Sequence, residues 1–166
     1  FQAYEWIRGQ TSDVPFTRMN REIAVRQEHG KARVHPLILG SPLVDLHRWV
    51  SEDWRWEEDR FVARSCRLAS RWLEENYRAE DFYLHVDLFD PHEPWYPPEY
   101  LVKHFDPDYD GPPMHDPNYG HASVYSAEEL RNLRAHYKAM IMLVRKWVGH
   151  LLHKLKDLGI YDETLI

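Results

Sequence analysis

One histidine is fixed between two prolines, in the run of residues 90–95 (D-P-H-E-P-W). Each proline sets its own φ, so the imidazole of His92 is held by a stiffened turn rather than by a mobile loop. Such a ring can donate a hydrogen bond to an anionic oxygen, and it supplies a proton when its pKa suits. The carboxylates of Asp90 and Glu93 are close enough in sequence to orient the ring or to keep it protonated. Spacing alone favours the simpler interpretation of a surface turn histidine packed against Trp95.

The turn follows a segment, residues 82–89, whose side chains alternate in character. Alternation with a period of two is typical of a strand, so we expect one here. One side carries Phe82, Leu84, Val86 and Leu88, and the other carries Tyr83, His85, Asp87 and Phe89. On the second side, His85 and Asp87 are candidates for buried polar partners with a structural role.

Helices are predicted on both sides of this segment. Apolar steps of three and four predict a helix over 54–76, and a helical turn is expected at 98–104. Ser126 and Glu129 form a capping box that starts the strongest helix, and Gly159 ends it. Its expected buried stripe consists of Leu130, Leu133, Tyr137, Ile141, Val144, Val148, Leu151, Leu155 and Leu158.

The weaker signals complete the predicted order of elements. An early strand is expected over 1–8, a short helix near 20–29, and a turn followed by the opening residues of another strand over 162–166. Strands that alternate with helices predict an α/β fold with some parallel pairing. Ligands of such folds bind beyond the carboxyl ends of the strands, which is where residues 90–95 leave the strand at 82–89.

Composition limits the class of protein. The 166 residues are enough for one domain, and a net charge of -6 argues against a nucleic-acid partner. A single cysteine, Cys66, excludes an internal disulfide framework. No apolar run reaches the length of a membrane span, and the compartment stays open. Because the sequence begins with Phe1 and ends with Ile166 in an apolar run, we expect an internal piece of a longer chain.

The strand followed by P-H-E-P resembles the middle of the sulfatase family, within the alkaline phosphatase superfamily. Residues 125–166 (Y-S-A-E-E-L-R … G-I-Y-D-E-T-L-I) resemble the family's long helix and the G-x-x-D-x-T-x-I start of a central strand. The opening F-x-x-Y-E-W-I-R-G-Q is similar to a stretch of one bacterial branch. The resemblance spans most of the chain and is thinnest over 11–54. It implies a partial sulfatase-like sheet flanked by helices, as a single fragment (1–166) of the catalytic domain.

The resemblance also implies a chemistry. Members of the family hydrolyse sulfate esters with a formylglycine, made from a cysteine in C-x-P-S-R, and a divalent cation, usually calcium. The histidine of P-H-x-P contacts the sulfate or the leaving-group oxygen, a role that carries over to His92. Trp95 and Tyr96 are expected to help shape the substrate pocket. The formylglycine and the metal ligands are expected outside this chain, so the fragment alone should be inactive.

The sequence departs from the family pattern in several places. Cys66 lies in S-C-R-L-A-S, inside a predicted helix, and is expected to be a buried packing residue. The G-K-x-H motif is absent, and Arg145 stands where many members have Asp. Residues 106–111 imitate the start of a calcium loop, but Pro117 stands where that loop needs a bidentate Glu, so a turn is expected.

Two alternatives stay open at this point. The first is a phosphodiester or phosphonate monoester hydrolase of the same superfamily, because sulfate and phosphate esters need similar pockets. The second is a non-catalytic module whose aromatic loop, residues 95–125, binds a carbohydrate or a peptide. The substrate, the metal and the oligomeric state are not fixed by the sequence.

Overall fold

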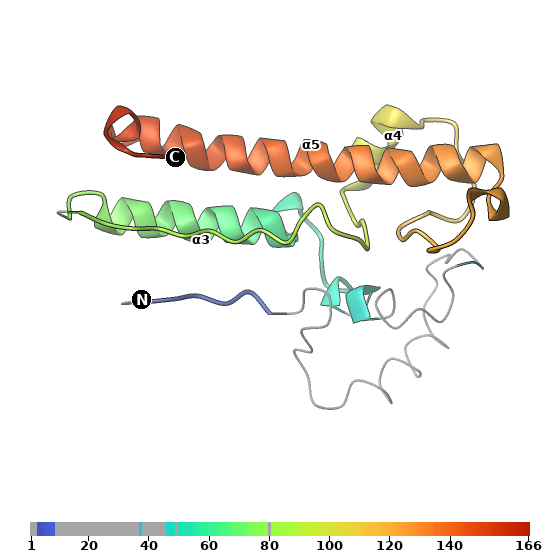
Figure 1. Cartoon of the computed structure of the whole chain (residues 1–166), viewed down its shortest axis with the longest axis horizontal. Coiled ribbons are helices and arrows are strands. Elements are labelled where there is room, and N and C mark those ends of the chain that lie inside the picture. The colour runs from blue at the N-terminus through green and yellow to red at the C-terminus, as the bar shows by residue number, and fades with distance from the viewer. Residues whose placement is uncertain (1–2, 9–36, 38–45, 49, 80) are drawn as a thin grey trace.

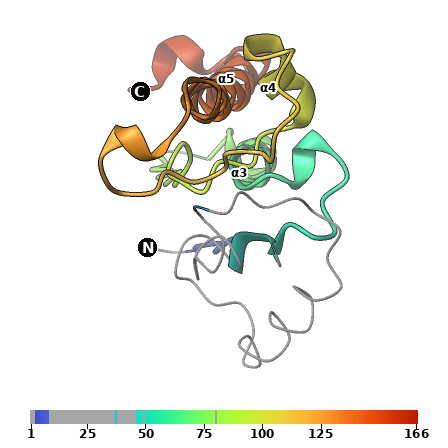
Figure 2. The ribbon, with the colours of Figure 1, turned by 90° about the vertical axis from the view of Figure 1, so that its right-hand side faces the viewer.

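The computed structural model describes residues 3–8, 37, 46–48, 50–79 and 81–166. Three α-helices dominate this part of the chain: α3 (Phe61–Asn76), α4 (Glu99–Phe105) and α5 (Ala127–Asp157). Short 3-10 turns precede α3 (η2, Glu57–Asp59), precede α5 (η3, Ala122–Val124) and follow it (η4, Tyr161–Glu163). Residues 46–48 and 50 are also helical. α3 lies beside the second half of α5 and runs in the same direction, and α4 packs on the other side of the pair (Figures 1 and 2).

The α/β prediction is wrong, because the described residues contain helices and no β-strand. Residues 82–89 do alternate as expected: Phe82 and Leu84 are half-buried, whereas Tyr83 is exposed. The segment runs back along α3, in front of it in Figure 1, but its backbone pairs with no other described segment. Periodicity reports which side chains are buried, and a strand also requires a neighbour for its backbone. The partial sulfatase-like sheet is therefore not formed here.

The other two predicted strands also differ from the structure. Residues 3–8 have no regular structure. Residues 161–163 form the 3-10 turn η4, in keeping with the expected turn, but residues 164–166 do not open a strand. Gly159 does end the long helix, with φ of 73°, a conformation that glycine adopts without steric cost. The helix expected near 20–29 lies outside the described residues.

The core is formed where α3 crosses the small residues of α5. Val62, Ala63 and Cys66 of α3 share one buried cluster with Ala135 and Ala139 of α5. Small side chains on both helices let the two backbones approach closely. Leu101 and Val102 of α4 join the same cluster, together with Met140, Leu143 and Trp147 of α5. Cys66 is fully buried, as expected for a packing residue.

The buried face of α5 is not the predicted stripe. Of that stripe only Leu155 is buried, while Tyr137 and Ile141 are each 43% exposed. The buried positions are Asn132, Ala135, His136, Ala139, Met140, Leu143, Trp147 and Leu155. The prediction differs from the structure for a physical reason. Two apolar stripes run along α5, and a hydrophobicity pattern ranks the more hydrophobic one higher. Close helix packing selected the stripe with alanines.

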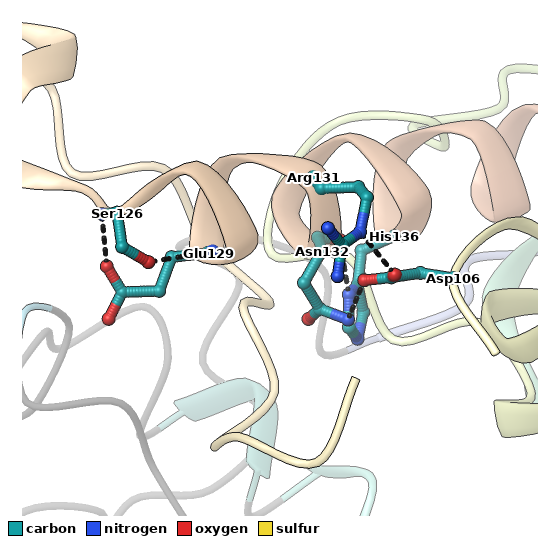
Figure 3. Close-up of polar contacts among 6 residues, drawn as sticks. All are labelled: Asp106, Ser126, Glu129, Arg131, Asn132 and His136. Atoms are coloured by element: carbon teal, nitrogen blue, oxygen red, sulfur yellow. Dashed lines mark hydrogen bonds and ion pairs between the residues drawn. The ribbon is translucent and has the colours of Figure 1, made fainter. Parts of the chain in front are cut away.

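Local signals at helix starts were more reliable. The Ser126 hydroxyl accepts a hydrogen bond from Glu129 N (3.1 Å), and the Glu129 carboxylate accepts one from Ser126 N (2.6 Å), which confirms the capping box (Figure 3). The helix predicted from Trp54 begins later, at Phe61. The Asp59 carboxylate binds the backbone N–H groups of residues 55 and 56, which holds this stretch in a 3-10 turn.

α5 has 31 residues, yet no described helix contains a stretch apolar enough to cross a membrane.

Candidate functional site

The turn that carries His92 is tied to the rest of the fold on both sides. On its first side, Asp90 Oδ2 accepts a hydrogen bond from Val62 N at 2.9 Å, in the first turn of α3. On its second side, the Trp95 indole donates to Pro91 O at 2.9 Å, and Trp95 N donates to His115 O at 2.6 Å. The peptide bonds that precede Pro91 and Pro94 are both cis. The turn that carries the histidine is therefore anchored to the fold at both ends and braced by one internal hydrogen bond.

Asp90 supplies the missing cap of α3. Arg60, at the N-cap position, makes no side-chain cap bond, so a carboxylate distant in sequence satisfies one free N–H of the helix start. Burial raises the pKa of Asp90 to about 6, against the opposing effect of the Val62 hydrogen bond. Burial, with a smaller contribution from Asp90, also raises the pKa of the Cys66 thiol to about 11. A thiol with so high a pKa inside a helix is unsuited to act as a nucleophile.

The His92 ring is exposed and oriented from within its own turn. Its Nδ1 lies 2.8 Å from the Glu93 carbonyl oxygen, to which it donates, and 3.4 Å from Glu93 Oε2. Because the carbonyl only accepts, the Nδ1 proton is assigned and Nε2 is left as the outward-acting nitrogen. The Phe89 ring stands 4.4 Å from the imidazole, centroid to centroid. The side chain keeps 44% exposure, so a ligand can reach it.

The structure brings Trp95 and Tyr96 close to this turn, but their ring faces are largely occupied. The Trp95 ring packs at 5.1 Å on Tyr137 of α5 and contributes to the core. The Tyr96 ring is stacked between His47 (4.3 Å) and His115 (4.1 Å). The first role of both residues in this structure is to fix the turn and the loop after it.

Tyr96 belongs to a column of four rings that sequence reasoning missed. The column runs His47, Tyr96, His115, His136, and its last contact is edge-to-face at 4.9 Å. It joins the helical residues 46–48, the loop after the His92 turn, the loop before η3, and α5. No spacing rule relates positions 47, 96, 115 and 136, so only the fold reveals the cluster.

The histidines of this column are neutral at physiological pH. Desolvation by burial lowers the pKa of His47 to about 3 and that of His115 to about 3. The positive charge of Arg60 further lowers the pKa of His47, and repulsion between the protonated forms of His136 and His115 further lowers the pKa of His115. Burial also lowers the pKa of His136, whose Nδ1 donates to Asn132 O at 3.0 Å.

Asp106 closes the far end of the column against α5 (Figure 3). Its carboxylate is 2.6 Å from Arg131 Nε and 3.2 Å from Asn132 Nδ2. Asn132 Oδ1 in turn accepts a hydrogen bond from Met114 N at 3.1 Å. The turn interpretation of residues 106–111 is in keeping with this geometry, because the first aspartate of the imitated calcium loop is fully engaged within the protein.

The described residues do not fit a calcium site. None of their His, Cys, Asp and Glu side chains gather in groups of three or more that would hold a metal ion. The carboxylates of Asp90 and Asp106 already have protein partners, at the start of α3 and on α5 respectively. His85 and Asp87 are exposed, so the idea of a buried polar pair on the extended segment is wrong. Arg145 is exposed on α5, and nothing in the structure explains its difference from the family pattern.

Comparisons of the chain with protein-family models, with curated proteins and with solved structures found no match.

Proposed function

We propose that this chain forms one wall of the active site of a sulfatase-like hydrolase, in which His92 contacts the sulfate ester. The observation that carries the proposal is the exposed imidazole on a turn anchored at Asp90, Pro91 and Trp95. A catalytic group gains from such anchoring, because its position need not be fixed again when the substrate binds.

The geometry of the ring defines what it would do. With the Nδ1 proton donated to the Glu93 carbonyl, Nε2 is the atom that faces the ligand. In its cationic form the ring donates from Nε2 to an anionic ester oxygen, and Glu93 Oε2 at 3.4 Å balances the charge. The same proton can pass to the leaving-group oxygen, which would make His92 a general acid.

The proposal places the nucleophile outside this chain. Cys66 is buried within α3, and the described carboxylates have no open metal-binding arrangement. Formylglycine and a divalent cation, calcium by resemblance, would come from elsewhere in an intact enzyme. We therefore expect the 166-residue chain to bind a sulfate group weakly and to turn nothing over.

The two alternatives fare differently. The same histidine could contact a phosphodiester or a phosphonate monoester in the same way. Hydrolysis of these esters therefore stays an alternative to hydrolysis of sulfate esters. The glycan- or peptide-binding reading needs open aromatic faces. The rings of Trp95 and Tyr96 contact Tyr137, His47 and His115, so on the loop 95–125 the open aromatic faces are those of Tyr100 and Tyr119, and this alternative rests on them.

The test with the chain itself is a titration with inorganic sulfate and with an aryl sulfate, followed by NMR of the histidine rings. The His92 ring signals should shift in a saturable way, and the shift should persist in Glu93→Gln, which removes the negative charge but keeps the backbone carbonyl that orients the ring. His104→Ala serves as the matched control, because His104 is an exposed histidine on α4, away from the turn. Equal shifts at every exposed histidine, or none at His92, would contradict the proposal.

A further inference from the structure

The start of α3 holds the loop that carries His92 at both of its ends. Before His92 in the chain, Asp90 Oδ2 accepts a hydrogen bond from Val62 N at 2.9 Å. After it, Arg60 Nε donates to Tyr96 O at 3.4 Å. The two contacts span 28 and 36 residues of sequence, yet both donors lie in the same turn of the chain. The loop therefore has two supports, and both belong to the start of one helix.

This start of α3 is a firm support. The Val62 side chain is 1% exposed and belongs to the buried cluster that α3 shares with α5. Arg60 is also held in place, because its Nη1 donates to Trp56 O at 2.5 Å and its guanidinium carbon lies 5.3 Å from the centre of the Trp54 ring. The groups that hold the loop are thus fixed by the packing of the helices.

The contact made by Asp90 depends on its acceptor oxygen more than on its charge. Burial raises the pKa of Asp90 to about 6, so the fold disfavours the ionised form even at a helix start. A small polar residue at the N-cap position would satisfy the helix locally, but Arg60 occupies that position and makes no side-chain cap bond. The distant carboxylate adds what a local cap cannot supply, a link between α3 and the turn with His92.

We propose that Asp90 is a positioning residue for His92, with Arg60 as the second support, so that the start of α3 sets where the imidazole Nε2 lies. The inference rests on the proposed contact between His92 and the ester, and it adds which part of the fold places that histidine. Asp90 touches neither the substrate nor the reacting atoms and acts only through His92. Position matters for a catalytic group, because a displacement of about 1 Å can lower a rate by roughly a hundredfold.

The first test is NMR of the 166-residue chain without any substrate. The Phe89 ring, 4.4 Å from the His92 ring between centroids, gives the His92 ring protons shifts that depend on the shape of the turn. Asp90→Ala should move these signals toward the values of free histidine, and Asp90→Asn, which keeps an acceptor oxygen, should restore them. Asp87→Ala removes an exposed carboxylate from the segment before the turn and should leave them in place. A cap that only added stability would lower the free energy of unfolding without moving the ring signals.

A second variant covers the case in which Asp90→Ala does not fold. Asp90→Glu keeps the acceptor and lengthens the side chain by one methylene, so the chain should fold with displaced His92 signals. Arg60→Met should move them less, because the contact with Tyr96 O is the longer of the two. Native His92 signals in Asp90→Ala, or in Asp90→Glu where the alanine variant does not fold, would overturn the proposal.

The second test is kinetic and uses an intact enzyme that contains this chain. Asp90→Ala should lower kcat for an aryl sulfate by roughly tenfold or more with a smaller change in KM, and Asp90→Asn should recover most of the loss. In a His92→Ala background, Asp90→Ala should cause no further loss. An equal further loss there would overturn the proposal, because Asp90 would then act independently of His92. Turnover that does not depend on His92 would refute the proposed function instead, while the NMR signals still decide whether Asp90 positions the ring.

Discussion

Acidification should destabilise this protein through the ring column. His47 and His115 are held neutral, because burial lowers the pKa of each from 6.5 to about 3. The unfolded chain binds protons at these positions below about pH 6.5, whereas the folded chain does so only near pH 3. In that window the unfolded state carries more protons, so stability falls as the pH falls.

The expected size follows from these values. Between pH 7 and pH 5, a histidine with a folded pKa of about 3 instead of 6.5 costs about 2 kcal/mol of stability. The two together cost about 4 kcal/mol, and His136 adds to the loss, because its pKa is also lowered.

One buried acid opposes this effect. Burial raises the pKa of Asp90 from 3.8 to about 6, so the folded state takes up a proton before the unfolded state does. Protonation removes the buried charge of Asp90, which raises the free energy of unfolding by about 1 kcal/mol between pH 7 and pH 5. The histidines outweigh it, and a net loss of about 2–3 kcal/mol remains.

Urea unfolding at pH 7 and at pH 5 measures this loss directly. His47→Phe is the informative variant, because the His47 Nδ1 has no hydrogen-bond partner among the described residues and a phenyl ring can keep the stack with Tyr96. It should be nearly neutral at pH 7 and should remove about 2 kcal/mol of the pH dependence. His104→Ala, on the surface of α4, should leave the dependence intact. An unchanged pH dependence in His47→Phe would refute the reasoning.

Three further predictions concern the helices. Leu143→Ala should lower the free energy of unfolding by about 2–5 kcal/mol, because Leu143 is fully buried. Ile141→Ala, on the half-exposed stripe, should lower it by less than half as much. Equal losses in denaturant unfolding would mean that the other face of α5 is buried. Asp106→Ala leaves the buried Asn132 amide without its acceptor and should cost about 1–3 kcal/mol, while Asp108→Ala, at an exposed position, should cost less than about 0.5 kcal/mol in the same assay. Ser126→Ala removes the cap of α5 and should lower the thermal midpoint by an amount equivalent to about 1 kcal/mol; no change would show that the cap adds nothing to stability.

The parts of the fold that sequence predicted have local causes. The capping box at Ser126, the stop at Gly159 and the proline turn around His92 each depend on a few neighbouring residues. The burial of Cys66 follows from the apolar period of α3 in the same way.

The parts that sequence missed depend on distant residues. Alternation over 82–89 predicted the correct faces, yet it could not tell whether another segment pairs with the backbone. On α5 the buried stripe is the one that forms a common core with residues of α3 and α4, and it includes alanines that a hydrophobicity pattern ranks low. The ring column and the cap that Asp90 gives to α3 join positions that are distant in the sequence. Such contacts follow from how the elements pack, which no local pattern encodes.

The most direct test of the proposed function is hydrolysis by an intact, metal-loaded protein that contains this chain and a matured nucleophile. An aryl sulfate is compared with a matched phosphodiester and a phosphonate ester, each with the unmodified protein, with His92→Ala and with the control His104→Ala. The account predicts sulfate turnover that falls roughly a hundredfold or more in His92→Ala and is unchanged in the control, the scale expected when one transition-state donor is lost. Preference for the phosphorus esters would keep His92 and change the reaction, whereas turnover that does not depend on His92 would contradict the central claim.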